Sequence, residues 1–407
     1  MQNSRLTQVK FKLGRVEFGG QRPNSEIQEI RCLSPDSPIA PVCLRIMHDV
    51  IVIGGGVIGL SIARELASRK SVLLLDRAPT GQGTSHAAAG MLTPLSEADD
   101  QGPFFQLCRT SLGMYDRFVE ELQQESSLDV AYSKEGLLSL ASSEESAATL
   151  LRRYEWQHQA GFEVELLPPG EVRKMEPLVT VPTIHALFMP GERSVAPRLL
   201  LNAIRESCVV RGVEILTGIH VDAVSPNTVH FAHMTMQAAS IVIASGVWSA
   251  EFNGLKPPIP VSPRKGQILS LAMAPGAFHR MIRWGHSYLV PRPTGELIVG
   301  ATNEDAGFDS SVTPAGLGRL LTDAQTISSY LGSYPIVETW TGLRPATPDE
   351  LPILGSTEVH GVYYATGHYR NGVLLAPITA TIVADLIEGH QSVIDLEPYS
   401  PSRFESS

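Results

Sequence analysis

The chain has 407 residues, of which 43% are hydrophobic and 18% charged, and its formal net charge is −10 at pH 7. This composition is that of an ordinary globular protein, and the length predicts two closely joined domains. The negative charge argues against a general nucleic-acid binder, and no apolar run reaches the ~20 residues that a membrane span requires.

Residues 1–46 mix Gln, Asn, Ser, Pro and charged residues without helical or strand periodicity. The acidic residues Glu17, Glu26 and Glu29, and the lack of an apolar central region, argue against a secretory signal. We expect a disordered extension or a mis-assigned start, with Met47 as the true start, and a transit peptide stays open as the alternative. Strand-like order is expected from residue 49 onward.

The ordered chain opens with a strand, a helix and a second strand. Residues 49–53 (DVIVI) form a short β-branched run bounded by glycines, which is typical of a fully buried parallel strand. Residues 57–68 have helical spacing, and residues 71–75 (SVLLL) predict a second buried strand that ends at Asp76. These segments form a βαβ unit.

Later segments alternate between helical and strand-like patterns. Helices are predicted at 104–124, 198–211, 314–331 and 371–388, and strands at 136–141, 164–167, 184–188, 213–216, 239–244, 287–291, 296–301, 337–341 and 361–365. Residues 287–301 form a hairpin around Pro293-Thr294-Gly295. Strands of the parallel type occur in three separate regions, with antiparallel material between them. We therefore predict one discontinuous domain and a second domain built from its insertions.

The first strand and helix enclose a G-x-G-x-x-G motif made by Gly54, Gly56 and Gly59. Such a motif between a strand and a helix, with Asp76 at the end of the next strand, predicts a dinucleotide site. Gly54 permits the tight turn, Gly56 permits the close approach of a pyrophosphate, and Gly59 permits close packing of the helix. The N-terminus of the helix then attracts the phosphates. The alternative is a glycine turn with a purely structural role. Residues 241–246 lack this spacing, so a single motif is present, which favours FAD over NAD.

Several longer segments resemble the D-amino-acid-oxidase-like flavoenzymes and, within them, the glycine oxidases of thiamine biosynthesis. They are GGGVIG (54–59), TSHAAAGML (84–92), IVIASGVWS (241–249), YLVPRPTGELIVGAT (288–302), ETWTGLRPATPDELPILG (338–355) and GHYRNGVLLAPIT (367–379). The resemblance covers nearly all of residues 47–389, and GHYRNG is more typical of glycine oxidases than of their sarcosine-oxidising relatives.

The resemblance implies an α/β (α+β) fold with a discontinuous, glutathione-reductase-type FAD-binding Rossmann-like domain and an inserted substrate domain on a mixed or antiparallel sheet. The implied FAD domain comprises residues 47–110, 190–257 and 337–395. The implied substrate domain comprises residues 111–189 and 258–336, and residues 396–407 form a tail.

The resemblance also implies which residues border the cofactor. They are Val57 and Ile58 at the pyrophosphate, Asp76 and Arg77 at the adenosine ribose, Thr84, Ser85, Ala89, Gly90 and Met91 along the ribityl chain and flavin, Val221 at the adenine, and His368, Tyr369, Arg370, Asn371, Gly372, Val373 and Leu374 at the isoalloxazine. His86 departs from the small residue that the family carries at this position.

Oxidation of an amino acid by a flavin requires a clamp for the carboxylate, and the planar fork of an arginine provides one. Arg344, expected in the turn after strand 337–341, is the first candidate, and Arg370 is the second. Tyr288 is a candidate O–H donor to the same carboxylate, and His286 is a candidate neighbour of the substrate. The alternatives are ordinary surface charges for the arginines and core positions for Tyr288 and His286.

Hydride transfer needs no dedicated base if a dry pocket favours the neutral amine, so we assign no catalytic residue. Asn371 and Gly372 begin the last helix, whose N-terminus is expected to stabilise negative charge on the flavin. The cysteines, Cys32, Cys43, Cys108 and Cys208, form no CxxC pair and no zinc pattern, which predicts no metal site. Because no cysteine follows Cys208, we expect FAD to be bound without a covalent link.

These features predict an FAD-dependent glycine oxidase that supplies an imine for the thiazole of thiamine. The alternatives are oxidation of D-alanine, D-proline or sarcosine, or an FAD-binding subunit without activity. The expected ligands are a small amino acid and O2, without nucleic acid. A cytoplasmic homo-oligomer is expected, tetrameric by resemblance, with thiazole synthase as a candidate partner.

Overall fold

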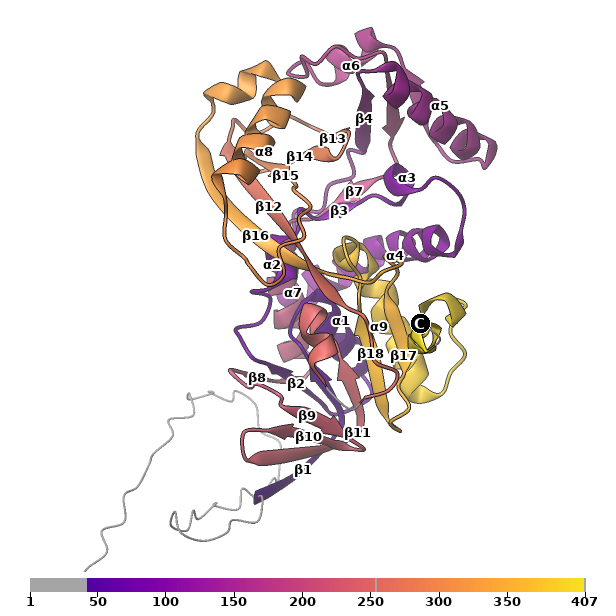
Figure 1. The fold of residues 1–407 in the computed structure, drawn as a ribbon, viewed down its shortest axis with the longest axis vertical. Helices are drawn as coiled ribbons and strands as arrows, with labels where there is room; N and C mark the ends of the chain where they lie inside the picture. The colour runs from indigo at the N-terminus through magenta and orange to yellow at the C-terminus, as the bar shows by residue number, and fades with distance from the viewer. Residues whose placement is uncertain (1–41, 253–254, 406–407) are drawn as a thin grey trace, which may run out of the picture.

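The computed structural model describes residues 42–252 and 255–405, which form two lobes stacked along the long axis of the molecule (Figure 1). Each lobe is built on one eight-stranded sheet, and the described chain begins and ends in the lower lobe of the view. None of the helices in the described part of the chain is long and apolar enough to cross a membrane.

The sheet of the lower lobe has the strand order β17-β18-β11-β1-β2-β8, and β10 and β9 continue it from β11. Its strands are β1 (Val42–Ile53), β2 (Val72–Asp76), β8 (Glu214–Thr217), β9 (Ala223–Ser225), β10 (Thr228–Phe231), β11 (Met234–Ile243), β17 (Ile353–Ser356) and β18 (Val362–Thr366). β1 is parallel to β11 and β2, β2 is parallel to β8, and β11 is parallel to β18. Strands from three distant parts of the sequence therefore meet in one sheet, as predicted.

Both faces of β1 are buried over residues 50–53, which explains the unbroken apolar sequence of this part of the strand. Val50 and Val52 pack against helices on one face, whereas Ile51 and Ile53 belong to a second core on the other face. The helices on the first face are α1 (Val57–Leu66), α4 (Pro103–Ser126), α7 (Pro197–Val210) and α9 (Gly372–Glu388).

The sheet of the upper lobe has the order β16-β12-β15-β14-β13-β4-β6-β5 and is antiparallel except between β13 and β4. Its strands are β4 (Leu137–Ala141), β5 (Glu165–Leu167), β6 (His185–Met189), β12 (Ser262–Ala272), β13 (Met281–Trp284), β14 (Ser287–Pro291), β15 (Glu296–Gly300) and β16 (Ile336–Ala346). The helices of this lobe are α5 (Glu144–Gln159), α6 (Pro169–Met175) and α8 (Pro314–Ile327). The predicted hairpin is β14–β15.

Short elements complete the chain and connect the lobes. They are α2 (Thr84–Ala87), β3 (Met91–Leu92), α3 (Pro94–Glu97), β7 (Arg193–Ser194), η1 (Gly246–Glu251), η2 (Ser329–Ser333), η3 (Glu397–Tyr399) and η4 (Pro401–Phe404). Helix α8 ends before the predicted residue 331, because Ser328 is extended and a separate 3-10 turn follows.

The first strand begins at Val42 and not at residue 49 as the sequence predicts. Its early part pairs with the start of β11, and the register shifts between Cys43 and Met47. Residues 42–47 (VCLRIM) are apolar except for Arg45, but they do not alternate between apolar and polar side chains, so the pattern did not identify them as a strand. The rest of the predicted extension, residues 1–41, lies outside the described residues.

Strand β16 is the main departure from the predicted elements. It continues to Ala346 and pairs with β12 along its whole length, from Ser262 opposite Ala346 to Leu271 opposite Ile336. Residues 337–346, expected in the FAD domain, thus belong to the sheet of the upper lobe, whereas β17, β18 and α9 belong to the lower lobe. The other domain limits stay predictions.

Candidate functional site

A cavity of about 670 Å³ lies between the lobes and is lined by residues of both sheets. Its volume is within the range of sites that hold cofactors and small ligands. The wall from the lower lobe includes the β1–α1 turn, the end of β2 and the start of α9, and the wall from the upper lobe includes side chains of β12, β13, β14 and β16.

The glycine turn after β1 forms a cradle in which a larger residue does not fit. Gly54 has φ +112°, and a Cβ at this position would lie 2.4 Å from the carbonyl oxygen of Ala244. A Cβ on Gly59 would lie 1.8 Å from the carbonyl oxygen of Gly54, so Gly59 allows α1 to pack on the turn and does not itself line the cavity. Gly56, Val57 and Ile58 line the cavity at the N-terminus of α1, where backbone N–H groups favour phosphates. This arrangement fits a dinucleotide pyrophosphate.

Asp76 joins the end of β2 to the glycine turn. Its Oδ2 accepts a hydrogen bond from the Gly55 N–H at 2.7 Å, and its Oδ1 accepts one from Ala78 at 3.1 Å. Burial raises the pKa of Asp76 and outweighs the hydrogen bonds from Ala78 and Gly55. The carboxylate therefore holds the turn and lines the cavity, and its contact with a ribose stays a prediction.

Next to Asp76, Arg77 stacks on an aromatic ring that sequence reasoning missed. The guanidinium carbon of Arg77 lies 3.4 Å from the centroid of the Trp248 ring, and both residues line the cavity, as does Val221. The sequence did contain a sign that Trp248 lies near the cofactor, because it belongs to the IVIASGVWS segment and follows strand β11.

The segment from α2 to β3 lines the middle of the cavity. Thr84, Ser85, Ala89, Gly90 and Met91 all border it, as do Ala87 and Ala88, which were not predicted. Ser85 Oγ accepts a hydrogen bond from the Val57 N–H at 3.0 Å, and the Thr84 hydroxyl donates to the carbonyl of Leu343.

His86 is not among the residues that line the cavity. Its carbonyl accepts a hydrogen bond from Arg198 Nε at 3.4 Å, and burial, with the charge of Arg198, lowers the pKa of its ring. The departure from the family pattern at this position therefore lies outside the cofactor cavity.

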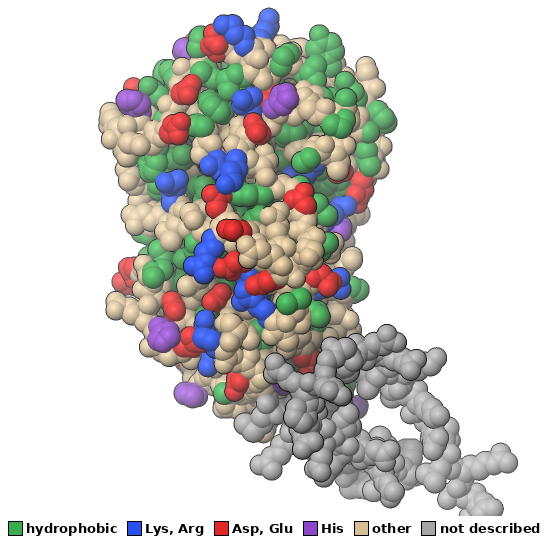
Figure 2. Space-filling model, turned by 180° about the vertical axis from the view of Figure 1, so that it is seen from behind, with side chains coloured by type: hydrophobic (Ala, Val, Ile, Leu, Met, Phe, Trp, Pro, Cys, Tyr) green, Lys and Arg blue, Asp and Glu red, His purple; other side chains and the backbone are tan. Residues whose placement is uncertain are grey.

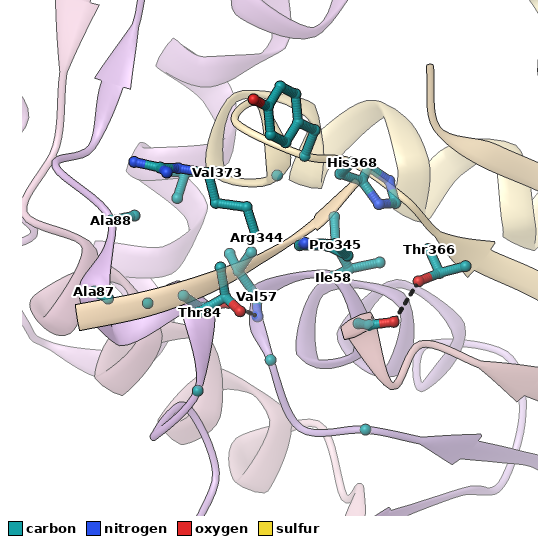
Figure 3. Close-up of a pocket in the computed structure, with 18 of the residues that line it drawn as sticks. Val57, Ile58, Thr84, Ala87, Ala88, Arg344, Pro345, Thr366, His368 and Val373 are labelled. Carbon is teal, nitrogen blue, oxygen red and sulfur yellow. Dashed lines mark hydrogen bonds between the residues drawn. The ribbon is translucent and has the colours of Figure 1, made fainter. Parts of the chain in front are cut away.

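The loop before α9 closes the cavity from the side of the lower lobe. His368, Tyr369, Arg370, Asn371, Gly372 and Val373 line it, whereas Leu374 is buried in the helix core and does not. His368 Nε2 lies 3.0 Å from Thr379 Oγ1, and burial lowers the pKa of His368 to about 3, so its ring is neutral at physiological pH. Figure 3 shows His368 beside Pro345, facing the same cavity.

Arg344 lies within strand β16, in place of the turn that the sequence predicts. Its Nη1 donates to the carbonyl of Thr302 at 3.1 Å, and Figure 3 shows the side chain pointing toward the side on which Ala88 and Val373 lie. The guanidinium passes over Gly266 of the neighbouring strand β12, where a Cβ would lie 2.3 Å from Nη2.

Tyr288 comes from β14 in the same sheet and lines the same cavity. Its ring lies over Gly300 of β15, where a Cβ would be 2.4 Å from the hydroxyl oxygen. The guanidinium of Arg344 lies over β12 and the hydroxyl of Tyr288 lies over β15. These two strands are neighbours in the sheet. Burial, aided by the charge of Glu97, raises the pKa of Tyr288, so the phenol keeps its proton as a donor.

The two remaining candidates lie at the rim. Arg370 is 42% exposed, stacks on the Tyr369 ring at 5.1 Å, and has Nη2 3.9 Å from a carboxylate oxygen of Glu350. His286 is exposed just before β14 and lines the cavity. Both side chains are exposed, whereas Arg344 is half-buried.

An ion pair between Glu97 of α3 and Arg283 of β13 also lines the cavity and was not predicted. No local pattern marks these residues, because only the tertiary structure brings α3 to the sheet. Within the described residues, no group of His, Cys, Asp and Glu is arranged to hold a metal ion.

The charged side chains on the molecular surface are of both signs. On the face turned away from Figure 1, acidic and basic side chains are interspersed across the middle of the molecule (Figure 2). A mixed surface of this kind, on an acidic chain, does not favour nucleic-acid binding.

Comparisons with known proteins agree with this geometry. A glycine oxidase from Geobacillus kaustophilus is 34% identical over 367 residues, which cover 88% of this chain and 97% of that protein. The bifunctional protein ThiO/ThiG of Synechocystis sp. is 36% identical over 370 residues, and the chain spans about half of its length, 54%. The crystal structure of glycine oxidase from Geobacillus kaustophilus superposes with a TM-score of 0.85 at 33% identity, covering 88% of this chain and 99% of that one.

Residues 49–386 match the family model described as DAO, FAD dependent oxidoreductase, and this range holds the glycine turn and all the residues that line the cavity. The chain belongs to the DAO family of FAD-dependent oxidoreductases.

Proposed function

We propose that this protein is a glycine oxidase, which converts glycine, O2 and water into glyoxylate, ammonia and hydrogen peroxide. The observation that carries the proposal is the approach of Arg344 and Tyr288, from the same sheet, to the cavity that the dinucleotide turn also lines. The glycine oxidases among the relatives support the choice of substrate.

In this proposal the carboxylate of glycine lies between the guanidinium of Arg344 and the hydroxyl of Tyr288. Arg344 offers N–H donors in a rigid fork, and Tyr288 offers an O–H that its raised pKa keeps protonated. The carboxylate thereby fixes the orientation of the Cα–H bond. The neighbouring rim residues, His286 and Arg370, are proposed as secondary contacts.

Bound FAD supplies the acceptor for the hydride that leaves Cα. The substrate must lose an ammonium proton beforehand, and removal of the amine from water on binding favours its neutral form. We assign no residue as a general base. Water then hydrolyses the imine to glyoxylate and ammonia.

The N-terminus of α9 is proposed to offset negative charge that develops on the cofactor. Gly372 and Val373 of its first turn line the cavity, and the Asn371 side chain makes no capping hydrogen bond to the helix. The free N–H groups and the positive end of the helix dipole therefore face the site.

Anaerobic titration with glycine, followed by flavin absorbance, tests the proposal. We expect the flavin to bleach, and we expect Arg344→Met to raise KM for glycine by roughly 10- to 100-fold because a hydrogen bond to a charged group is lost. Arg344→Lys keeps the charge without the fork, so its KM should lie between those of the wild type and Arg344→Met.

Faster peroxide formation from D-alanine than from glycine would instead favour the rival amino-acid oxidase. Bound FAD that no amino acid reduces would identify a non-catalytic subunit. The proposal has further parts. The enzyme would supply the imine to thiamine synthesis, act with thiazole synthase, lie in the cytoplasm and form a homotetramer. The joined ThiO/ThiG relatives support the partnership.

A further inference from the structure

A buried arginine behind the cavity wall has no acidic partner among the described residues. Arg292 lies in the turn between β14 and β15, where its backbone N–H donates to the carbonyl of Glu296 at 2.8 Å. Its side chain is only 8% exposed, and it is not among the residues that line the cavity. No salt bridge within residues 42–252 and 255–405 includes its guanidinium. A buried charge without such a partner is unfavourable unless a negative group approaches it.

The guanidinium of Arg292 joins the cavity wall to the segment behind it. Nη2 donates to the carbonyl of Ala89 at 2.5 Å, and Nη1 donates to the carbonyl of Val195 at 3.0 Å. The Val195 N–H donates in turn to the carbonyl of Gly90 at 2.9 Å, next to the pairing of β3 with β7. Because Ala89 and Gly90 line the cavity, Arg292 lies directly behind this part of the wall. Both acceptors are neutral carbonyls, so they orient the guanidinium without neutralising its charge.

The charge of Arg292 acts on a side chain that faces the cavity. Burial lowers the pKa of Arg292 to about 10, against the opposing charge of Glu296, so the guanidinium is charged at pH 7. Burial raises the pKa of Tyr288, and the positive charges of Arg344 and Arg292 both oppose that rise. Tyr288 lines the same cavity as Ala89, so the field of Arg292 extends through the wall into the cavity.

Oxidation of an amine places a negative charge on the cofactor in this cavity. The Cα–H bond breaks, and two electrons and one proton pass together to FAD, which gains one negative charge. The neutral amine becomes an iminium, so that electrons, protons and charge balance. A fixed positive charge that is shielded from water stabilises an anion that forms near it.

We propose that Arg292 is a positioning residue whose buried charge favours the reduced form of FAD and whose fork fixes Ala89 in the cavity wall. It acts through the wall, because its own side chain does not line the cavity. Its charge adds to the effect proposed for the N-terminus of α9. The role concerns the cofactor alone, so it holds for any amine substrate and goes beyond the oxidation of glycine.

The midpoint potential of bound FAD tests the role of this charge. The holoenzyme is reduced at pH 7 without any amino acid, by xanthine and xanthine oxidase, beside a dye of known potential. Arg292→Gln removes the charge and keeps an amide donor for the carbonyl of Ala89. We expect it to lower the ratio of reduced to oxidised FAD about tenfold at a given potential, a downward shift of ~30 mV for a two-electron couple. Arg292→Lys keeps the charge, so its potential should stay close to that of the wild type.

Two further variants make the result specific. Arg173→Met removes an exposed arginine of α6 and should leave the potential unchanged, because solvent screens that charge. Glu296→Gln keeps Arg292 and removes the acidic group that opposes its charge, so it should raise the potential. This variant decides the question if neither Arg292 variant retains FAD.

The role of Arg292 is overturned if Arg292→Gln has the potential of the wild type, or if Arg292→Lys falls as far as Arg292→Gln. It is also overturned if Glu296→Gln does not raise the potential, or if Arg173→Met lowers it as much as Arg292→Gln does. Because no amino acid takes part, the result does not depend on the substrate. An enzyme whose flavin glycine does not bleach, but whose potential follows Arg292, would overturn the proposed function and leave this role intact.

Discussion

At the scale of single residues, two glycines make room for the polar side chains of the candidate carboxylate site. A Cβ on Gly266 would lie 2.3 Å from Arg344 Nη2, and one on Gly300 would lie 2.4 Å from the Tyr288 hydroxyl. Neither glycine has a positive φ, so each is required for space and not for backbone freedom. Each glycine lies one strand away from the side chain that it accommodates.

The substitution Gly266→Ala tests this arrangement. The new methyl group must displace the guanidinium of Arg344, which is the mobile end of a long side chain, so we expect little change in thermal stability. KM for glycine should rise by about tenfold or more, because the carboxylate loses its aligned donors. Steady-state peroxide assays and thermal melts measure the two effects.

Gly318→Ala is the matched control, since a Cβ at this position of α8 has no atom within 4 Å. It should leave KM unchanged and stabilise the helix slightly. An unchanged KM in Gly266→Ala would show that Arg344 does not act from the position seen in the structure.

At the scale of elements, a buried charge network joins α1, α4 and α7. Arg64 of α1 is 2% exposed, and its Nη2 lies 2.9 Å from Glu125 Oε2 of α4. Arg211, at the end of α7, donates to the same carboxylate from Nη2 at 2.6 Å, and Ser207 of α7 also bonds to it. Burial alone would raise the pKa of Glu125, but Arg211, Ser207 and Arg64 together lower it from 4.5 to about 2.

This depressed pKa predicts how stability depends on pH. The ionised Glu125 stabilises the folded state fully above pH 4.5, and the contribution, on the order of 3 kcal/mol, is lost as the pH falls toward 2. Glu125→Gln should therefore be clearly less stable than the wild type at pH 7, and the difference should shrink between pH 4.5 and 3. Chemical denaturation at each pH measures the difference.

Glu135→Gln, at an exposed position, is the control and should change stability little at either pH. If Glu125→Gln lowers the free energy of unfolding by the same amount at pH 7 and pH 3, the lowered pKa of Glu125 is contradicted.

At the scale of the whole molecule, the cofactor cavity is part of the contact between the lobes. Its wall combines the glycine turn of the lower lobe with β12 and β16 of the upper lobe. Outside the cavity, Arg198 of α7 forms a bidentate pair with Glu338 of β16, with N–O distances of 2.7 and 3.0 Å, and its guanidinium lies 4.8 Å from the Trp340 ring. FAD bound in this cavity would therefore contact the same two lobes that these protein contacts join.

Removal of FAD should consequently lower the thermal stability of both lobes. A cofactor that binds only the folded state adds about 2.7 kcal/mol at a free concentration 100 times its Kd. Melts of the apoprotein, the holoenzyme and the holoenzyme with excess FAD should show a rising Tm in that order. An apoprotein with the Tm of the holoenzyme would contradict this coupling.

Acid precipitation of the holoenzyme tests whether FAD is bound without a covalent link. Cys108 and Cys208 are buried free thiols away from the cavity lining, so acid precipitation should release all the flavin. Yellow colour that stays with the precipitate would show a covalent bond.

The sequence by itself determined the features that depend on neighbouring residues. The β1–α1–β2 unit, the glycine turn with Asp76 and the β14–β15 hairpin are each encoded within a short stretch, where local periodicity and turn chemistry suffice. Resemblance then predicted residues such as Thr84 and Val221, which do line the cavity.

Only the tertiary structure decided the features that depend on distant segments. Arg344 lies inside a strand because β16 pairs with β12. Leu374 is buried in the core of the lower lobe, and Glu97 forms an ion pair with Arg283. Residues 342–346 (GLRPA) were predicted as a turn because Gly342 and Pro345 are typical turn residues, and the pairing with β12 that makes them a strand is not visible in this segment. Pairing between remote segments leaves no mark on either segment alone, and for that reason the ion pair of Glu97 with Arg283 could not be predicted before the fold was known.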